Sequence, residues 1–171
     1  MKKFYRAFTC MMLVISVGSP LVVANRDYVE ITNEVANIRT ANTTNSQVVG
    51  QARKGDIFRL EEEMGNWYRV QMFSGDSRYI YSTLARIIGR RTPSAPDSLE
   101  VRQSFFFAWL DVRSQAAEEA AQRFAPTSNL ERYYQLFNLL LDRYLLEACH
   151  EWGVQPAAYR RIIIEGNQAG W

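Results

Sequence analysis

The apolar residues of this chain change their spacing at one stretch, IIGRRTPSAPDS, which covers residues 87–98. Before it, short β-branched and aromatic runs alternate with turn residues, a pattern typical of strands. After it, apolar residues recur every three or four positions, which indicates helices. The glycine, prolines and serines of the stretch itself disfavour both structures. We therefore predict an α+β chain in which a small β-barrel (residues 25–88) and a short antiparallel helical bundle (residues 98–171) are joined by a linker at 89–97.

The first 24 residues have the pattern of an export signal. Three basic residues within the first six precede the apolar run FTCMMLVISV, and small or β-branched residues lead to Ala24. We predict cleavage after Ala24 and a periplasmic or extracellular location. The alternative is a retained membrane anchor, because residues 7–24 carry no charge. That run is only at the lower length limit of a membrane-spanning helix, and Gly18 and Pro20 interrupt it.

Loss of the signal would change the charge balance of the chain. The full sequence has 20 Lys and Arg against 18 Asp and Glu; three of the bases and none of the acids lie before residue 25, which leaves 17 bases. A nearly neutral protein has no general attraction for nucleic acid or for an anionic membrane, so we expect neither as a partner. Cys149 would be the one cysteine remaining, so no intrachain disulfide is expected.

Five strands are predicted in the first half, at residues 27–32, 47–53, 56–63, 66–73 and 78–82. The clearest hairpin turn is Gly75-Asp76, which lies between two aromatic runs. Five short strands within about 60 residues are too few for a large sandwich, whereas a small barrel also removes exposed strand edges.

Short motifs follow one another in this half in a recognisable order. They are Asn37-Ile38-Arg39, Val48-Val49-Gly50, Lys54-Gly55-Asp56, Gly65-Asn66-Trp67-Tyr68-Arg69-Val70, Tyr79-Ile80 and Leu84. With them, residues 28–88 resemble the bacterial SH3-like (SH3b) domain. The resemblance implies a small barrel in which Trp67 and Val70 are mainly structural. The chain departs from the usual family pattern at Ala36, at Asn42 and at Arg78-Tyr79, where the family usually has Leu, Pro and Gly-Trp.

Two long helices and one short helix are predicted in the second half. Asp97 with Glu100, and Ser128 with Glu131, have the spacing of capping boxes at the two long helices. Gly153 ends the second helix, and Pro156 opens the third, which is expected to finish near Gly166. The apolar face expected for the first helix contains Leu99, Phe106, Leu110, Ala117, Ala121 and Phe124, and it is widened by Phe105, Trp109 and Val112. No family motif is evident in this half.

Catalytic patterns are weak throughout the sequence. Cys149 and His150 are adjacent on a predicted helix, where neighbouring side chains point about 100° apart, and Cys149 lies on the apolar stripe. We therefore interpret them as a buried thiol beside a surface histidine. The chain has one histidine, so the further residues that a histidine-based triad or a zinc amidase site would need are missing. Glu61–Glu63 and Glu118-Glu119 are interpreted as solvated charges. We expect no catalytic site, no metal and no cofactor.

Binding residues are more plausible around residues 65–81, where aromatic side chains outnumber the places inside a small barrel. Strand alternation puts Tyr79 and Tyr81 on the face opposite Arg78 and Ile80. Tyrosine offers a flat apolar ring with a hydroxyl group, and arginine can pair with a carboxylate. The predicted ligand-binding residues are Tyr68, Arg69, Arg78, Tyr79 and Tyr81.

These features favour an exported, non-catalytic binding protein of the bacterial envelope. Its SH3b-like barrel would recognise cell-wall glycopeptide or an extended peptide. In the alternative hypothesis, the protein acts in assembly or as an adaptor, and the helical half (residues 98–171) binds a protein partner or a second copy. The aromatic residues Phe105, Phe106, Phe107 and Trp109 motivate this alternative, because they almost encircle the first helix.

Overall fold

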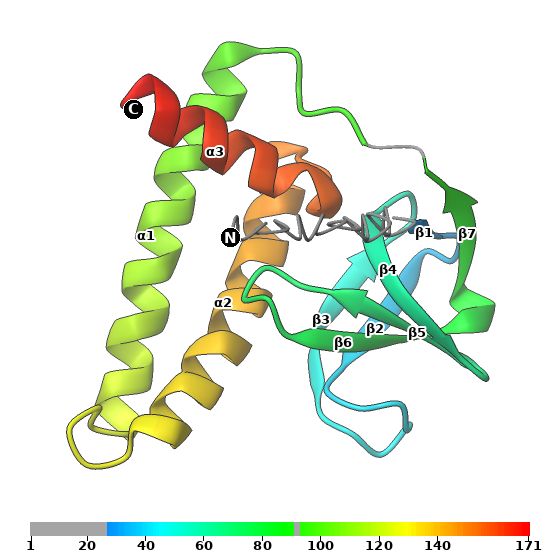
Figure 1. The fold of residues 1–171 in the computed structure, drawn as a ribbon, viewed down its shortest axis with the longest axis horizontal. Coiled ribbons are helices and arrows are strands. Elements are labelled where there is room, and N and C mark those ends of the chain that lie inside the picture. The colour runs from blue at the N-terminus through cyan, green and yellow to red at the C-terminus, as the bar shows by residue number, and fades with distance from the viewer. Residues whose placement is uncertain (1–26, 91–92) are drawn as a thin grey trace, which may run out of the picture.

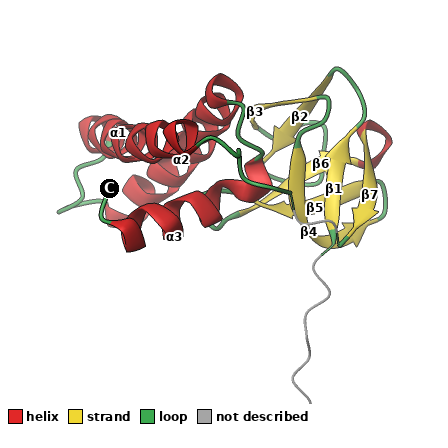
Figure 2. Cartoon of the chain, turned by 90° about the horizontal axis from the view of Figure 1, so that it is seen from above, coloured by secondary structure: helices red, strands yellow, loops and turns green. Residues whose placement is uncertain are grey.

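The computed structural model describes residues 27–90 and 93–171, and the predicted export signal lies outside this range. Its first half is one antiparallel sheet in the order β3-β2-β6-β5-β4-β1-β7, which curls into a small barrel (Figure 2). The strands are β1 (Tyr28–Ile31), β2 (Val35–Arg39), β3 (Val48–Arg53), β4 (Ile57–Met64), β5 (Trp67–Gln71), β6 (Ser77–Tyr81) and β7 (Ala85–Gly89). A short 3-10 helix, η1 (Ser82–Leu84), connects β6 to β7.

All five predicted strands are present, and two strands were not predicted. β2 follows β1 after only three residues, and β7 occupies the residues just before the predicted linker. Both are five residues long, and both become strands through pairing with their neighbours. β2 pairs with β3 and β6, while β7 pairs with β1. The α+β class, a small SH3-like barrel followed by helices, is confirmed.

The barrel core consists of the inward-facing side chains of all seven strands. It contains Val29, Ile31, Ala36, Ile38, Val49, Ala52, Phe58, Val70, Ile80 and Ala85, each of which is buried. Phe58 is the largest of these and is almost completely removed from solvent. Three tight turns in this half use a glycine with positive φ, at Gly55, Gly65 and Gly75.

The second half contains α1 (Leu99–Arg123), α2 (Leu130–Trp152), the 3-10 turn η2 (Pro156–Ala158) and α3 (Tyr159–Ala169). α1 and α2 run antiparallel side by side, and α3 crosses them with its first turn directed toward the barrel (Figure 1). α3 fits closely on α1, because a Cβ added at Gly166 would lie 2.3 Å from Cδ2 of Phe106. No helix within residues 27–90 and 93–171 has the length and apolarity needed to cross a membrane.

Several details of the helices differ from the predictions. The N-cap of α1 is Ser98, whose Oγ accepts a hydrogen bond from the Val101 N–H, and the N-cap of α2 is Asn129. α3 continues past Gly166 to Ala169. On α1 the buried residues are Phe105, Phe106, Ala116 and Ala120, whereas Leu110 and Ala121 are exposed. The prediction that Gly153 ends α2 is confirmed, since Gly153 is its left-handed C-cap.

The two halves pack together through one continuous apolar core, a question that the sequence left open. Leu141, Leu145, Leu146 and Cys149 of α2 belong to the same buried cluster as the barrel residues. The contact with β3 is close, because a Cβ at Gly50 would lie 3.1 Å from Cδ2 of Leu146. The helical half therefore covers one side of the barrel (Figure 2).

Polar contacts between the halves surround this apolar core. Nε2 of His150 lies 2.7 Å from Oδ2 of Asp56, so His150 is not the surface residue that we predicted. The backbone N–H of Ile57 donates to Oε1 of Gln155 at 3.0 Å. Asp142 of α2 accepts from the Ser74 N–H at 2.8 Å. Barrel and helices are thus held in one orientation by directional contacts.

Candidate functional site

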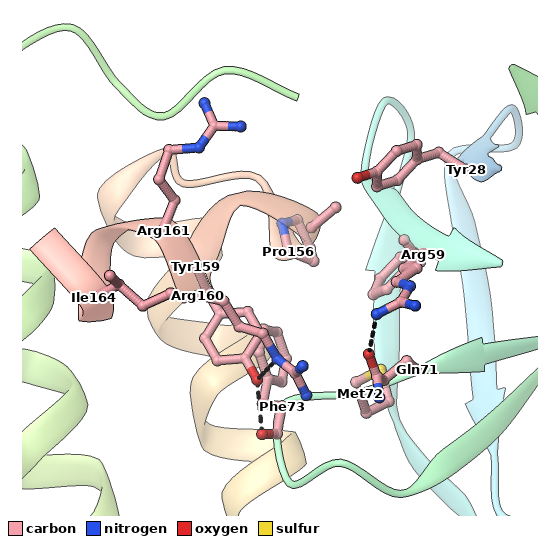
Figure 3. Close-up of a pocket in the computed structure, with 12 residues that line it drawn as sticks. Tyr28, Arg59, Gln71, Met72, Phe73, Pro156, Tyr159, Arg160, Arg161 and Ile164 are labelled. Carbon is pink, nitrogen blue, oxygen red and sulfur yellow. Dashed lines mark hydrogen bonds between the residues drawn. The ribbon is translucent and has the colours of Figure 1, made fainter. Parts of the chain in front are cut away.

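A cavity of about 460 Å³ lies at the seam between the barrel and α3 (Figure 3). The barrel supplies its wall from β1, β4 and the end of β5, with Tyr28, Phe58, Arg59, Gln71, Met72 and Phe73. The helical half supplies the facing wall from η2 and α3, with Pro156, Ala157, Tyr159, Arg160, Arg161 and Ile164. A volume of this size is within the range of small-ligand pockets.

The floor of the cavity is apolar and firmly placed. Met72 and Phe73 follow β5 and are buried, although they precede an exposed hairpin turn. Phe73 meets the ring of Tyr159 edge-on, with centroids 4.9 Å apart. The Tyr159 hydroxyl donates to the Phe73 carbonyl oxygen at 2.9 Å. Burial raises the pKa of Tyr159 above its usual value, so this hydroxyl stays protonated and remains a donor at neutral pH.

Three arginines stand around the cavity, and no carboxylate lines it. Arg59 donates to Oε1 of Gln71 at 3.1 Å, and Nε of Arg160 donates to the Tyr159 hydroxyl at 2.9 Å (Figure 3). Arg160 and Arg161 leave α3 in different directions (Figure 3). Among the residues that the structure describes, none of these three guanidinium groups forms an ion pair, whereas others in the chain do, such as those in Arg86–Glu30 and Arg102–Glu165. The cavity therefore combines an apolar floor with uncompensated positive charge.

Three of the five predicted binding residues share the outer face of the barrel. The register pairs Arg69 with Tyr79 and Trp67 with Tyr81, so these four side chains lie on one face of β5 and β6. The rings of Trp67 and Tyr81 meet edge-on at 5.1 Å. Arg69 is held by Glu61 and Glu62, with N–O distances of 3.4 and 2.9 Å. The aromatic rings are present at this face, but its arginine already has anionic partners.

The other two predicted residues, Tyr68 and Arg78, lie on the opposite face. Tyr68 packs against the common apolar core. Arg78 is only 8 % exposed, and its Nη2 lies 2.8 Å from Oδ2 of Asp142 and 3.0 Å from Oδ2 of Asp76. The prediction of Arg78 as a surface ligand residue is therefore corrected: its guanidinium joins the barrel to α2. A signal for this was available, since Arg78 shares its strand face with the core residue Ile80, whereas the sequence pattern had placed Asp142 on the solvated face of α2.

The cavity residues themselves were missed by the sequence analysis. Phe73 and Tyr159 are 86 positions apart, and they meet only because α3 docks on the barrel. Arg160 and Arg161 had no feature that separated them from other surface arginines. The aromatic end of β5 and the proline that opens η2 were noted, but as elements of structure.

The cysteine and histidine pair does not form a catalytic arrangement. Burial raises the pKa of the Cys149 thiol well above its ordinary value, which disfavours the nucleophilic thiolate. His150 is directed to Asp56 of the barrel. In the described parts of the chain, no three His, Cys, Asp or Glu side chains are grouped as metal ligands.

Comparison with family models gives one match. Residues 34–84 match the model of the bacterial SH3 domain, which confirms the resemblance seen in the sequence. The matched segment contains β2 to β6 and η1, whereas β1, β7 and the three helices lie outside it. A search of curated proteins finds no match. Residues 34–84 are thus a bacterial SH3 domain, and one wall of the cavity comes from helices that this domain match does not include.

Proposed function

We propose that this protein is an exported, non-catalytic binding protein of the bacterial envelope, and that it binds an extended peptide or the peptide part of cell-wall glycopeptide. A bacterial SH3 domain is a binding module, which supports the general class of function. The specific proposal places the ligand in the cavity between the barrel and α3.

The observation that carries this proposal is the combination of an apolar floor with unpaired arginines. Apolar side chains of a peptide can pack against Met72, Phe73 and Pro156, all of which are buried at the cavity. A carboxylate of the ligand can pair with Arg160 or Arg161, and guanidinium groups suit such pairs because they can donate two parallel hydrogen bonds. Stem peptides of the cell wall combine small apolar side chains with free carboxylates, so they fit this description.

Two specific observations favour a second binding face and a second candidate function. The partly exposed rings of Tyr79 and Tyr81 on the outer face favour stacking on a sugar ring or a proline. On α1, Phe107 and Leu110 are exposed, which favours the assembly hypothesis for the helical half. The experiment below separates the first of these from the cavity.

The test is co-sedimentation of the purified protein with cell-wall sacculi. Arg160→Gln with Arg161→Gln should lower the bound fraction at limiting protein about tenfold or more, because two exposed charge-assisted contacts are removed. Arg53→Gln with Arg143→Gln is the matched control, since it removes two exposed arginines, one on β3 and one on α2, that do not line the first cavity. The control should bind like the wild type.

Tyr79→Ala with Tyr81→Ala completes the design. Unchanged binding by this variant places the ligand away from the outer face, whereas a loss confined to this variant would assign the ligand to that face. A wild-type protein that stays in the supernatant at micromolar concentration would refute the cell-wall proposal.

A further inference from the structure

A second cavity, of about 390 Å³, continues from the first on the other side of Tyr159. Phe73, Tyr159, Arg160 and Ile164 line both cavities. The second cavity adds apolar groups from the two long helices, among them Trp109 of α1 and Phe137 of α2. The two spaces are therefore neighbours that meet at the first turns of α3.

The second cavity repeats the chemistry of the first. Arg113 lies over the ring of Trp109, with its guanidinium carbon 4.9 Å from the ring centroid. No carboxylate lines this cavity, and within residues 27–90 and 93–171 Arg113 takes part in no ion pair. The guanidinium is thus held in place by an aromatic ring and keeps its full charge for another partner.

We infer that the two cavities form one elongated site for an extended peptide with two acidic groups. One acidic group pairs with Arg59 or Arg161 in the first cavity, and the other pairs with Arg113 in the second cavity. The apolar part between them crosses Tyr159, next to Arg160. This inference rests on the proposed binding function of the first cavity, but it does not depend on the cell wall as the source of the peptide.

The position of the charges selects this ligand over an anionic lipid. A fatty acid or phospholipid carries its charge at one end and would leave the arginines at the other end of the site without a partner. An inorganic anion would make no use of the apolar floor formed by Met72, Phe73 and Phe137. A peptide with acids at both ends and apolar residues between them satisfies both parts of the site.

The test uses capped alanine and leucine peptides with two Glu residues separated by two to five apolar positions. Their binding is measured by calorimetry, and the Trp109 indole signal, assigned with Trp109→Phe, is followed by NMR. At one spacing, the peptide with two Glu residues should bind about tenfold more tightly than either peptide with one Glu replaced by Gln, and it should shift the Trp109 signal. Arg113→Gln should remove the advantage of the second Glu, whereas Arg53→Gln should not.

Equal binding of the peptides with one and two Glu residues, or an unmoved Trp109 signal, overturns the inference. So does tighter binding of oleate, with the peptides displaced from the site. If the peptides with two Glu residues bind as expected but sacculi do not, the cell-wall proposal fails and the inference stands. If sacculi bind through Arg160 and Arg161 while Arg113→Gln affects no peptide, the proposed function stands and the inference fails.

Discussion

Asp142 offers the sharpest test of the forces that join the two halves. Its side chain is completely buried in the middle of α2. Oδ1 accepts from the Ser74 N–H at 2.8 Å, and Oδ2 lies 2.8 Å from Nη2 of Arg78 without the alignment of a hydrogen bond. Burial raises the pKa of Asp142 to about 6, against the lowering effects of Arg78 and of the Ser74 hydrogen bond, while nearby Asp76 adds to the increase.

The direction of this shift sets the expected dependence on pH. A carboxyl group whose pKa is higher in the folded protein binds its proton more tightly there, so its contribution to stability is complete below the unfolded value of 3.8. That contribution is lost as the pH rises through about 6. A change from 3.8 to about 6 at 1.36 kcal/mol for each unit corresponds to about 3 kcal/mol.

The perturbation is Asp142→Asn, which keeps the shape and an acceptor for the Ser74 N–H but cannot ionise. Urea unfolding followed by tryptophan fluorescence at pH 4, 5, 6 and 7 gives the free energy of unfolding of both proteins. The wild-type value minus the Asp142→Asn value should fall by about 2 kcal/mol between pH 4 and pH 7, because part of the total of about 3 kcal/mol is already lost at pH 4.

A control without an ionisable group accounts for the general effect of pH on stability. Leu145→Val truncates a fully buried side chain on the same helix and should lower the free energy of unfolding by about 1 kcal/mol at every pH. A wild-type minus Asp142→Asn difference that is constant, or that grows with pH, would refute the reasoning. Growth with pH would mean that attraction to Arg78 outweighs the cost of burial.

Three further substitutions test helix packing, a hydrogen bond between the halves and a helix cap. Gly166→Ala should lower the free energy of unfolding by about 1–2 kcal/mol in urea titrations. The new Cβ would meet the Phe106 ring, and this overpacking outweighs the better helix propensity of alanine. Phe106→Leu in the same background should recover part of the loss. Gln155→Ala should cost about 1–3 kcal/mol by leaving the Ile57 N–H without its partner, and hydrogen exchange of that amide should accelerate, whereas an unchanged rate would contradict this assignment. Ser98→Ala should cost about 1 kcal/mol through the lost cap of α1, while Ser98→Asp should retain the wild-type melting temperature.

Much of the barrel could be predicted because its information is local. The turn glycines, the alternation of β3 to β6 and the family motifs all lie within a few residues of the structure they specify. β2 and β7 lie outside the five predicted strands, although Ala36 and Ile38 of β2 alternate inward. They become strands only when β3, β6 and β1 supply hydrogen-bonding partners.

The buried face of α1 shows a different limit of the sequence pattern. We expected Ala117 and Ala121 inside, and the structure buries Ala116 and Ala120 instead. Small residues let two helices approach closely, so the contact is decided by the shape of the partner as well as by hydrophobicity. Alanines occur at several adjacent positions here, and the sequence alone did not select among them.

The candidate site was the least predictable part, because it belongs to neither half alone. Met72 and Phe73 end a strand of the barrel, and Tyr159 to Ile164 come from a helix near the other end of the chain. The burial of Asp142 was not expected either, because the sequence pattern placed it on the solvated face of α2. The predicted site was the aromatic strand face instead, because strand alternation can be inferred from local sequence, whereas the docking of α3 on the barrel cannot.

The docked arrangement argues against a helical half that is only tethered to the barrel. Leu145 and Leu146 complete the barrel's apolar cluster, Gln155 satisfies a backbone N–H of β4, and Asp142 meets both Ser74 and Arg78. Separation would expose these apolar groups to water and break the hydrogen bonds that Gln155 and Asp142 accept from the barrel, which is costly on both counts. Because both walls of the cavity depend on this docking, a ligand that fills the cavity must also favour the docked state by mass action. Under the proposed function, ligand binding and the docking of the two halves are therefore thermodynamically linked.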